Sequence, residues 1–320
     1  MKIIKPIIEA LKSAREVVLA GHTNPDADSM GSCFAMAFAL EKLGIKPYVL
    51  LEEYGEKYNV LPGFQFVYKH SLDKIEPDIF MILDCGDRYR LGKYKNAFPY
   101  VKTIVVDHHL SNKNFGDYNY IDKNASSTCE LLYPLIKSLT EMDTNIAACL
   151  YAGIVTDTGG FRFRATTPET LRIAGELMEF DFPFWEYSDK LMYRQNLVQF
   201  KAFSSIINNF VMLEDLGLVY VTVTEEQLKE LNISYNDIDG VSQFLNRIEE
   251  ADIAVFVYEK GGKTKMSLRS KETDVNELAS RFGGGGHKYA GGLEMVASPE
   301  EAIGKVIEVL KLSRQNKLTD

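Results

Sequence analysis

Hydrophobic positions gather in short runs in the first third of the chain. Each run is partly β-branched, is bordered by polar or turn residues and has the length of one buried strand. The runs are residues 16–22 (EVVLAGH), 47–51 (PYVLL), 77–84 (PDIFMILD) and 102–107 (KTIVVD). A helical pattern, residues 29–44, follows the first run, with Ser29 as its expected N-cap and Gly44 as its expected end. This alternation predicts a parallel α/β sheet with helices on both faces.

The hydrophobic pattern changes twice in the rest of the chain. From about residue 124 to 210 it is mostly helical, and after Asp215 strand-like runs return with GLVYVTVT, ADIAVFVYEK and TKMSLRS. A helical pattern and the glycine-rich segment RFGGGGHKYAGG follow, which predicts a smaller mixed α/β domain. With 320 residues the chain is long enough for two cores. We expect a first domain at 1–186, a helical linker at 187–213 and a second domain at 214–320.

The composition is that of an ordinary globular protein, with 46% hydrophobic and 25% charged residues. No apolar run approaches the roughly 18 residues of a membrane span, and the N-terminus lacks the apolar core of a secretory signal. We therefore expect a cytoplasmic protein with no membrane partner. The four cysteines include no C-x-x-C pair, which disfavours a disulfide framework or a zinc ribbon. A formal net charge of −9 disfavours long duplex nucleic acid as a partner, because such binding requires many cations.

Acidic residues and histidines follow three of the four predicted strands, and one more acid ends the helical run AGIVTDTGG. These residues are His22, Asp26, Asp28, Asp84, Asp107, His108, His109 and Asp157. The carboxyl ends of parallel strands border one crevice, so we expect these side chains to converge. Several carboxylates at one place repel one another unless cations compensate their charge. Oxygen ligands with some imidazole suit magnesium or manganese, and the ligands are numerous enough for two ions.

Six motifs carry a resemblance to a known family. They are, in order, HTNPDAD, LDCGD, DHH, GIVTDTGGFRF, SLRSK and GGGGHKYAGG. Together they resemble the DHH/DHHA1 phosphoesterases, specifically the short two-domain members that act on nano-RNA and 3′,5′-bisphosphorylated nucleosides. The resemblance spans nearly the whole chain. It implies a catalytic DHH domain, a substrate-binding DHHA1 domain, and an active-site cleft between them. Two divalent ions are implied, with Mn²⁺ preferred over Mg²⁺. Members of the family often form homodimers, although no interface motif is visible in this sequence.

The resemblance also implies roles for the acids and histidines named above in the first domain. The implied metal ligands are His22 and Asp26 for one ion, Asp28, His108 and Asp157 for the second, and Asp84 as the bridge between them. His109 would contact the substrate phosphate, and Asp107 would orient the imidazoles, although a strand-end cap is the simpler alternative for Asp107. Asp87 is interpreted as a cap of the following turn, and His70 is given no role.

In the second domain, glycine-rich GGGGHKYAGG has two interpretations. A glycine run is usually a flexible loop, but glycines also let backbone N–H groups approach an anion closely. The resemblance favours the second interpretation and implies the following substrate contacts: Arg269, His287, Gly285, Gly286 and Lys288, with Lys271 adding positive charge. Residues 161–164 alternate phenylalanine and arginine, which is typical both of base-stacking segments and of plain core and surface alternation.

The implied activity is two-metal hydrolysis at phosphorus. One expected substrate class is short single-stranded oligoribonucleotides, which an exonuclease activity would degrade to nucleoside monophosphates. The other expected substrate is 3′-phosphoadenosine 5′-phosphate (pAp), which would be dephosphorylated to AMP. The nearest enzymatic alternative is a phosphodiesterase for cyclic-di-AMP or for the linear dinucleotides pApA and pGpG. A catalytically silent nucleotide sensor is the alternative from another class, and the intact metal-ligand motifs disfavour it.

Overall fold

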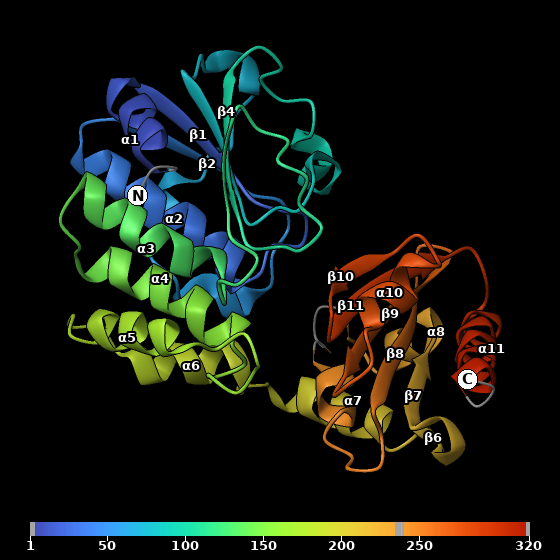
Figure 1. Ribbon diagram of the computed structural model, residues 1–320. Helices are drawn as coiled ribbons and strands as arrows, with labels where there is room; N and C mark the ends of the chain where they lie inside the picture. Colours follow the sequence, from blue (N-terminus) through green and yellow to red (C-terminus); the bar gives the residue numbers. More distant parts are fainter. Residues whose placement is uncertain (1–3, 234–237, 239, 318–320) are drawn as a thin grey trace. The chain divides into compact units, whose positions relative to one another are not determined.

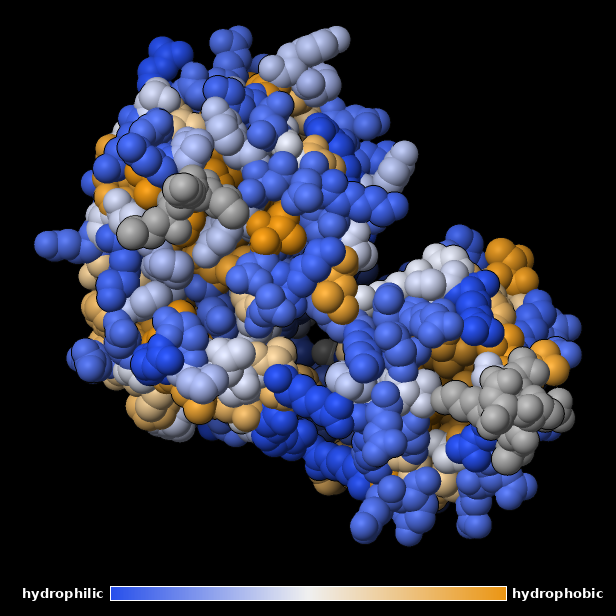
Figure 2. All heavy atoms as spheres, in the orientation of Figure 1, coloured by the Kyte–Doolittle hydropathy of each residue, from blue (hydrophilic) through white to orange (hydrophobic). Residues whose placement is uncertain are grey.

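The computed structural model describes residues 4–233, 238 and 240–317. The chain forms two units, unit 1 (Met1–Arg194) and unit 2 (Gln195–Asp320), which are described separately (Figure 1). Among the described residues, no helix is both long and apolar enough to cross a membrane. Hydrophilic side chains cover most of the surface in view in Figure 2.

Unit 1 contains a sheet of five parallel strands, sheet A. The strands are β1 (Glu16–Ala20), β2 (Lys46–Leu50), β3 (Ile79–Leu83), β4 (Lys102–Asp107) and β5 (Tyr118–Ile121), in the order β2-β1-β3-β4-β5. The four predicted runs form β1 to β4, which confirms the predicted parallel sheet. Strand β5 was not predicted, because YNYI lies half-buried at the sheet edge and lacks an apolar run.

Helices cover both faces of sheet A, as predicted, but they differ in kind. The α-helices of unit 1 are α1 (Ile4–Ser13), α2 (Ala27–Lys42), α3 (Thr128–Leu139), α4 (Thr144–Asp157), α5 (Pro168–Leu177) and α6 (Phe184–Met192). Val17 and Leu19 share a core with helices such as α2, α3 and α4. Val18 and Ala20, which point to the other face, pack against short 3₁₀ segments, including η3 (Leu72–Lys74) and η4 (Arg88–Tyr94). Two further 3₁₀ segments are η1 (Glu56–Val60) and η2 (Phe64–Phe66).

Helix α2 begins three residues earlier than the sequence pattern predicted. Its N-cap is Asp26, whose Oδ1 accepts hydrogen bonds from the backbone N–H groups of Asp28 (3.1 Å) and Ser29 (3.0 Å). The prediction of Ser29 as N-cap was therefore wrong, because the carboxylate of Asp26 satisfies the free N–H groups of the first turn. Gly44, with φ of 75°, follows the helix end as predicted.

Unit 2 is built on a mixed six-stranded sheet, sheet B. Its strands are β6 (Val211–Leu213), β7 (Leu218–Val223), β8 (Ile253–Lys260), β9 (Lys263–Ser270), β10 (Gly285–His287) and β11 (Ala290–Met295), in the order β10-β11-β9-β8-β7-β6. Only β7 and β8 are parallel among these described pairs. The predicted mixed α/β domain is confirmed.

Helices pack on both faces of sheet B as well. One core joins the sheet to α10 (Val275–Ser280) and α11 (Pro299–Lys317). A second core joins the other face to α7 (Leu197–Ile207), α8 (Glu225–Glu230) and α9 (Val241–Leu245). The 3₁₀ segment η5 (Glu214–Leu216) connects β6 to β7.

Candidate metal centre

The carboxyl ends of β1, β3 and β4 lie next to one another in sheet A, and the three polar motifs follow them. Asp84 comes directly after β3, and its backbone N–H donates to the carbonyl of Val106 on β4 (3.0 Å). Its φ of 54° lies in the left-handed region, which aspartate tolerates better than most residues. The sheet therefore places the Asp84 side chain between the loops that follow β1 and β4.

The first group of potential ligands consists of His22, Asp26 and Asp84. The Nε2 atom of His22 lies 3.3 Å from Oδ2 of Asp84 and 3.8 Å from Oδ2 of Asp26. The other ring nitrogen, Nδ1, lies 2.8 Å from the carbonyl oxygen of Thr23. A proton on Nδ1 makes this hydrogen bond and leaves Nε2 available to a cation.

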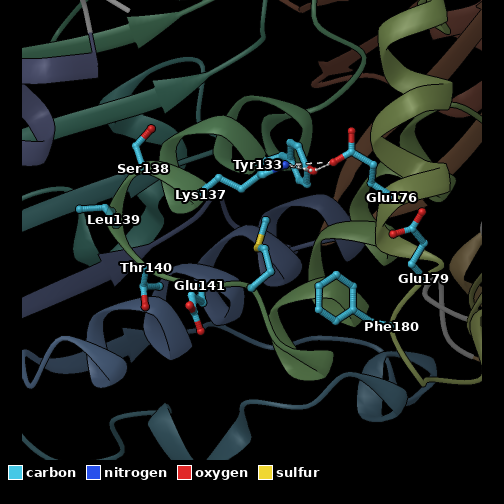
Figure 3. A pocket seen from close by; sticks show the side chains of 10 residues that line it. Tyr133, Lys137, Ser138, Leu139, Thr140, Glu141, Glu176, Glu179 and Phe180 are labelled. Atoms are coloured by element: carbon cyan, nitrogen blue, oxygen red, sulfur yellow. Dashed lines mark hydrogen bonds and ion pairs between the residues drawn. The ribbon is translucent and has the colours of Figure 1, made fainter.

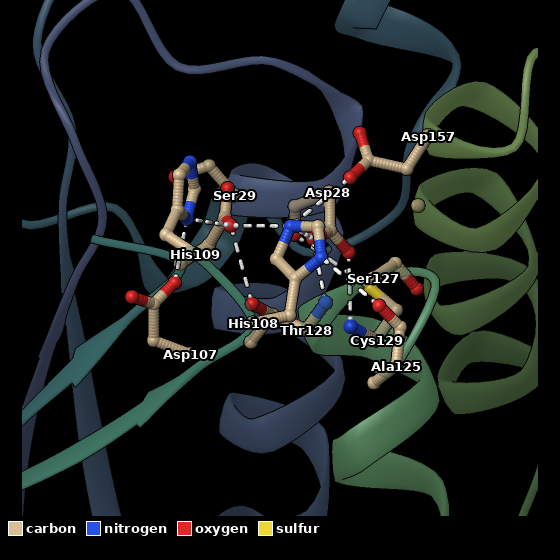
Figure 4. A network of polar contacts seen from close by, with 12 residues as sticks. Asp28, Ser29, Asp107, His108, His109, Ala125, Ser127, Thr128, Cys129 and Asp157 are labelled. Atoms are coloured by element: carbon tan, nitrogen blue, oxygen red, sulfur yellow. Dashed lines mark hydrogen bonds and ion pairs between the residues drawn. The ribbon is translucent and has the colours of Figure 1, made fainter. Parts of the chain in front are cut away.

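The second group consists of Asp28, His108 and Asp157, from α2, the end of β4 and the end of α4 (Figure 4). The Nε2 atom of His108 lies 3.2 Å from Oδ2 of Asp157 and 3.9 Å from Oδ2 of Asp28. It also lies 3.6 Å from Oδ1 of Asp84. The two oxygens of Asp84 therefore face different groups, Oδ2 toward His22 and Oδ1 toward His108.

Asp28 is fully buried and is fixed by the start of α3. Its two oxygens accept hydrogen bonds from the backbone N–H groups of Thr128 (2.7 Å) and Cys129 (2.9 Å), the first two residues of that helix. The N–H groups and dipole of a helix N-terminus stabilise a carboxylate. Helix α4 approaches at Gly153, where a Cβ atom would lie 2.6 Å from Oδ1 of Asp28. Only glycine leaves room for this carboxylate.

His109 belongs to a separate chain of polar contacts. Its Nδ1 lies 2.7 Å from Oδ1 of the buried Asp107, and Oδ2 of Asp107 accepts a 2.7 Å hydrogen bond from the buried Asn112. Its Nε2 lies 3.3 Å from Nη1 of Arg90. Nδ1 of His109 also lies 3.6 Å from Oδ1 of Asp84, so this chain reaches the metal-ligand groups.

Opposing effects act on the two buried histidines. Burial alone would lower the pKa of His22, but the hydrogen bonds and negative charges of Asp26 and Asp84 raise it to about 10. Burial would likewise lower the pKa of His108, yet hydrogen bonding to Asp157 and the surrounding carboxylates raise it well above its ordinary value. Both imidazoles therefore lie in a strongly negative environment.

The buried acids also differ from one another. Burial raises the pKa of Asp28 well above its ordinary value, and the negative charges of Asp84 and Asp157 add to this effect. Burial would also raise the pKa of Asp84, but hydrogen bonding to His22 and the positive charges of the histidines hold it well below its ordinary value. This crowding of like charges is what a bound cation relieves.

The donor set fits divalent cations. It consists of carboxylate oxygens and imidazole nitrogens, which suit hard or borderline ions, and each of the two groups brings its ligand atoms within 4.8 Å of one another. Among the described residues, the buried Ser29 Oγ beside these groups also lacks a hydrogen-bond partner. The residues present are therefore compatible with bound metal.

Arg90 and Asn112 were not predicted from the sequence. Asn112 lies in SNKNF, which shows no motif, and its contact with Asp107 depends on the loop after β4. Arg90 lies in η4, whose N-cap is Asp87, with Oδ1 accepting from the N–H groups of Tyr89 (2.6 Å) and Arg90 (3.3 Å). The interpretation of Asp87 as a cap is confirmed. A cap at Asp87 indicates that a helical turn begins there, and this was the one sequence signal for the position of Arg90.

The predicted substrate residues of the glycine-rich segment lie on a β-hairpin rather than in a flexible loop, and Arg269 lies on the neighbouring strand β9. Strand β10 pairs with β11, and β11 pairs with β9, so that His287 is opposite Ala290 and Ala290 is opposite Arg269. Residues directly opposite each other in antiparallel strands point to the same face. Arg269 and His287 therefore lie in one row on sheet B, with the small Ala290 between them.

The two predicted glycines of this hairpin differ. Gly286 has φ of 148°, and a Cβ atom there would lie 2.3 Å from the carbonyl oxygen of Ala290, whereas a Cβ atom at Gly285 would meet only an atom 3.8 Å away. Lys288 lies in the turn, with Nζ 5.3 Å from the centre of the Tyr289 ring. Lys271 serves the fold, because its Nζ donates to the carbonyl oxygen of Ile248 (2.5 Å).

The alternating segment 161–164 forms turns after α4 rather than an extended strand. Phe161 packs against the core of unit 1, while Arg162, Phe163 and Arg164 are exposed.

A surface pocket of about 580 Å³ lies between the ends of α3 and α5 and is lined by residues that include Tyr133 (Figure 3). It contains none of the predicted site residues.

Taken together, unit 1 is a parallel α/β domain in which carboxylates and imidazoles that could hold divalent cations gather at the carboxyl ends of the strands, and unit 2 is a smaller mixed domain. The model of the DHH family N-terminal domain matches residues 16–154, and the model of the DHHA1 domain matches residues 215–313. The chain therefore belongs to the proteins that combine a DHH domain with a DHHA1 domain.

Full-length relatives agree with this assignment. The chain is 29% identical to the bifunctional oligoribonuclease and PAP phosphatase NrnA of Bacillus subtilis, over 92% of this chain and 94% of the relative. It is 27% identical to the probable bifunctional oligoribonuclease and PAP phosphatase NrnA of Streptococcus mutans, over 91% and 93%. Its fold is similar to the crystal structure of an exopolyphosphatase-related protein from Bacteroides fragilis, with a TM-score of 0.89, 24% identity and coverage of 100% of this chain and 98% of that chain.

Proposed function

We propose that the chain is a metal-dependent phosphoesterase that hydrolyses short single-stranded oligoribonucleotides to nucleoside monophosphates and pAp to AMP. The observation that carries this proposal is the position of Asp84, whose two oxygens face His22 on one side and His108 on the other. The names of the relatives, which combine oligoribonuclease and PAP phosphatase, supply the substrate classes. Both activities are hydrolyses of phosphate esters, and the chain is a hydrolase.

We assign two divalent ions, preferably Mn²⁺, to the two groups. His22 and Asp26 would hold one ion, and Asp84 would bridge to the second. The residues for the second ion would be Asp28, His108 and Asp157. When bound, such ions polarise the phosphate and lower the pKa of a bound water. Asp28 would keep its orientation through the N-terminus of α3, so ligand geometry is set before the cations bind.

We assign substrate contact to His109 and Arg90. Asp107 accepts from Nδ1 of His109, which fixes the ring and directs Nε2 toward Arg90, and Asn112 fixes Asp107 in turn. The arginine can donate to a phosphate oxygen, and the histidine can do so when both of its ring nitrogens carry a proton, so that the pair would stabilise the charge that develops as the ester bond breaks.

We assign nucleotide binding to unit 2. Arg269 and His287 lie in one row of sheet B and offer two nitrogen donors to an anion, with Lys288 in the adjoining turn. Gly285 and Gly286 keep this edge free of side chains, so a phosphate can approach the backbone. In this scheme the DHH domain performs the chemistry and the DHHA1 domain selects the ligand.

The test is a hydrolysis panel with metal-stripped and reconstituted protein. The substrates are pAp, oligoribonucleotides of graded length, linear pApA and pGpG, and cyclic-di-AMP, with products identified by mass spectrometry. We expect no turnover in chelator, recovery with Mn²⁺ and a weaker recovery with Mg²⁺, and the highest kcat/KM for pAp and the shortest oligomers. Full turnover by protein that elemental analysis shows to be metal-free would overturn the proposal. A preference for cyclic-di-AMP would replace its substrate class.

A further inference from the structure

A second pocket of unit 1 lies at the carboxyl end of β2, the edge strand next to β1. Its volume is about 490 Å³. Its lining combines aliphatic and small polar side chains, His70 and Glu52 with a set of aromatic rings and lysines, which are Tyr54, Phe64, Tyr68, Tyr94, Lys69 and Lys93. The candidate metal centre uses none of these residues, although the pocket borders the same edge of sheet A.

The aromatic walls of this pocket are held in place by local contacts. The Tyr94 hydroxyl donates to the carbonyl oxygen of Leu51 (3.2 Å), and the Tyr68 hydroxyl donates to that of Ser71 (3.1 Å). The rings of Tyr54 and Phe64 lie 5.4 Å apart at an angle of 35°. Ordered aromatic rings of this kind are the platforms on which single-stranded nucleic acids stack their bases.

The pocket is connected to the metal centre through η4. At one end of η4, Arg90 contacts His109, and its carbonyl oxygen accepts a 2.7 Å hydrogen bond from the backbone of Thr23, next to His22. At the other end, the backbone N–H of Lys93 donates to Oε1 of Glu52 in the pocket wall (3.0 Å). Strands β2 and β3 are two strand spacings apart, which is about 10 Å. One extended substrate can therefore reach both places.

The charge of the pocket suits a polyanion with flat rings. Lys69 and Lys93 are exposed, and Nζ of Lys93 lies 5.0 Å from the centre of the Tyr94 ring. Among the described residues, Glu52 is the one acid that lines the pocket, and its Oε1 accepts from the backbone N–H of Lys93. In a protein with a net charge of −9, such a site attracts phosphate locally.

We propose that this pocket is an accessory subsite that stacks a base of an oligoribonucleotide whose scissile phosphate lies at Asp84, while Lys69 and Lys93 contact the adjoining phosphates. The proposal rests on the proposed function and deepens it. A substrate with further nucleotides reaches the pocket, whereas pAp carries a single base. The pocket therefore adds affinity for oligoribonucleotides over mononucleotides.

The test compares KM values for pAp and for a tetranucleotide in Tyr54→Ala and in a Lys69→Gln, Lys93→Gln double variant. Tyr54 is exposed, so its removal leaves the core of the domain intact. We expect Tyr54→Ala to raise the KM of the tetranucleotide about tenfold, the effect of losing one base–aromatic stack, and to raise that of pAp much less. The double variant should also weaken the dependence of tetranucleotide KM on salt concentration, because two phosphate contacts are lost. Tyr100→Ala is the matched control, since Tyr100 is 99% exposed and lies outside the pocket lining.

Two outcomes separate this proposal from the proposed function. If the unaltered protein hydrolyses neither pAp nor the tetranucleotide, the proposed function fails. If it hydrolyses both, and the pocket variants change the two KM values equally or not at all, only the subsite is overturned. Photocrosslinking of a 4-thiouridine tetranucleotide provides an independent readout, and the expected crosslinked peptides contain Tyr54 or Tyr94. Crosslinks confined to peptides outside the pocket would contradict the subsite.

Discussion

The two sheets of this protein place their polar residues in different ways. In sheet A the acids and histidines follow the strands, so a parallel arrangement gathers Asp84, Asp107 and His108 at one edge. In sheet B, Arg269 and His287 lie within strands and come into one row only through the pairing of β9, β11 and β10. Sheet A crowds like charges at its strand ends, and the proposed function compensates them with bound cations, whereas in sheet B the register of the paired strands brings the two side chains together.

The largest expected effect tests the charge crowding at the edge of sheet A. Asp84→Asn removes the charge of the carboxylate whose two oxygens face His22 and His108, but asparagine keeps the left-handed backbone conformation. Metal catalysis contributes several kcal/mol to the transition state, so we expect kcat to fall by about a thousandfold or more. The measurement is Mn²⁺-dependent hydrolysis of pAp together with metal content and circular dichroism.

Asp122→Asn is the control for Asp84→Asn. Asp122 also directly follows a strand of sheet A, but it is exposed and lies in none of the metal-capable groups found among the described residues. We expect its kcat to stay within about twofold, as for most exposed substitutions away from a site. Equal losses of kcat in both variants would show that the activity depends on negative charge near the strand ends in general, and not on Asp84 in particular.

The convergence of polar side chains in sheet A could be predicted from the sequence, because the carboxyl ends of parallel strands lie together whatever the details of packing. His22, Asp84 and His108 each stand directly after an apolar run or within two residues of it, so their meeting required only the parallel topology. Arg90 and Asn112 could not be found in this way. Their contacts with His109 and Asp107 depend on how the loops after β3 and β4 fold, and a single sequence has no periodicity that encodes this.

Sheet B shows the other limit of prediction. Glycines favour a loop by composition, but the hairpin forms because β11 can pair with β9 on one side and β10 on the other. The row formed by Arg269, Ala290 and His287 is a property of strand register, which long-range pairing determines. The sequence therefore identified residues of this segment by resemblance but not their arrangement.

The next effect concerns the support of His109. In Asn112→Ala, Asp107 loses the hydrogen bond from Nδ2 of Asn112 (2.7 Å), so the carboxylate that fixes Nδ1 of His109 becomes less well oriented. Loss of such supporting contacts typically costs about 10–100-fold. We expect kcat to fall by this amount with little change in KM for pAp, which steady-state kinetics measures. Asn119→Ala, which serves as the control, removes an amide on β5 whose Oδ1 accepts from the backbone N–H of Gly116 (3.0 Å) and whose Nδ2 donates to the carbonyl oxygen of Gly116 (2.7 Å). A matching loss in that variant would argue that loop stability alone is responsible.

In sheet B, two neighbouring glycines allow a sharper comparison. Gly286→Ala forces a side chain onto φ of 148° and places Cβ 2.3 Å from the Ala290 carbonyl oxygen, whereas Gly285→Ala meets only ordinary contacts. We expect Gly286→Ala to destabilise unit 2 by about 1–3 kcal/mol, seen as a fall of several degrees in Tm. Gly285→Ala should unfold at a Tm close to that of the unaltered protein. The pair is measured by calorimetry, and equal Tm values would mean that the hairpin relaxes without cost.

The smallest expected effect concerns an acid of unit 2 whose negative charge is stabilised by N–H and hydroxyl groups of the same unit. Asp252, before β8, accepts hydrogen bonds from the N–H groups of Lys271 (3.1 Å) and Glu272 (2.8 Å) and from the Thr273 hydroxyl (2.5 Å). Burial would raise the pKa of Asp252, but these hydrogen bonds, that of Thr273 first, lower it below its ordinary value of 3.8. The ionised form is therefore the one that stabilises the fold. This contribution is fully present above about pH 4 and is lost as the pH falls through the lowered pKa.

Asp252→Asn should accordingly lower the free energy of unfolding by about 1 kcal/mol at neutral pH, because a charged acceptor is replaced by a neutral one. The difference from the unaltered protein should shrink below pH 4, where Asp252 itself takes up a proton. Urea titrations of both proteins at neutral pH and below pH 4 measure this, with Glu272→Gln as the control in the same turn, where the carboxylate is exposed. A constant difference at all pH values would mean that the shape of the side chain, and not its charge, holds the turn that follows Arg269. Asp252 would then differ in kind from the acids of unit 1, whose charge the proposed function requires.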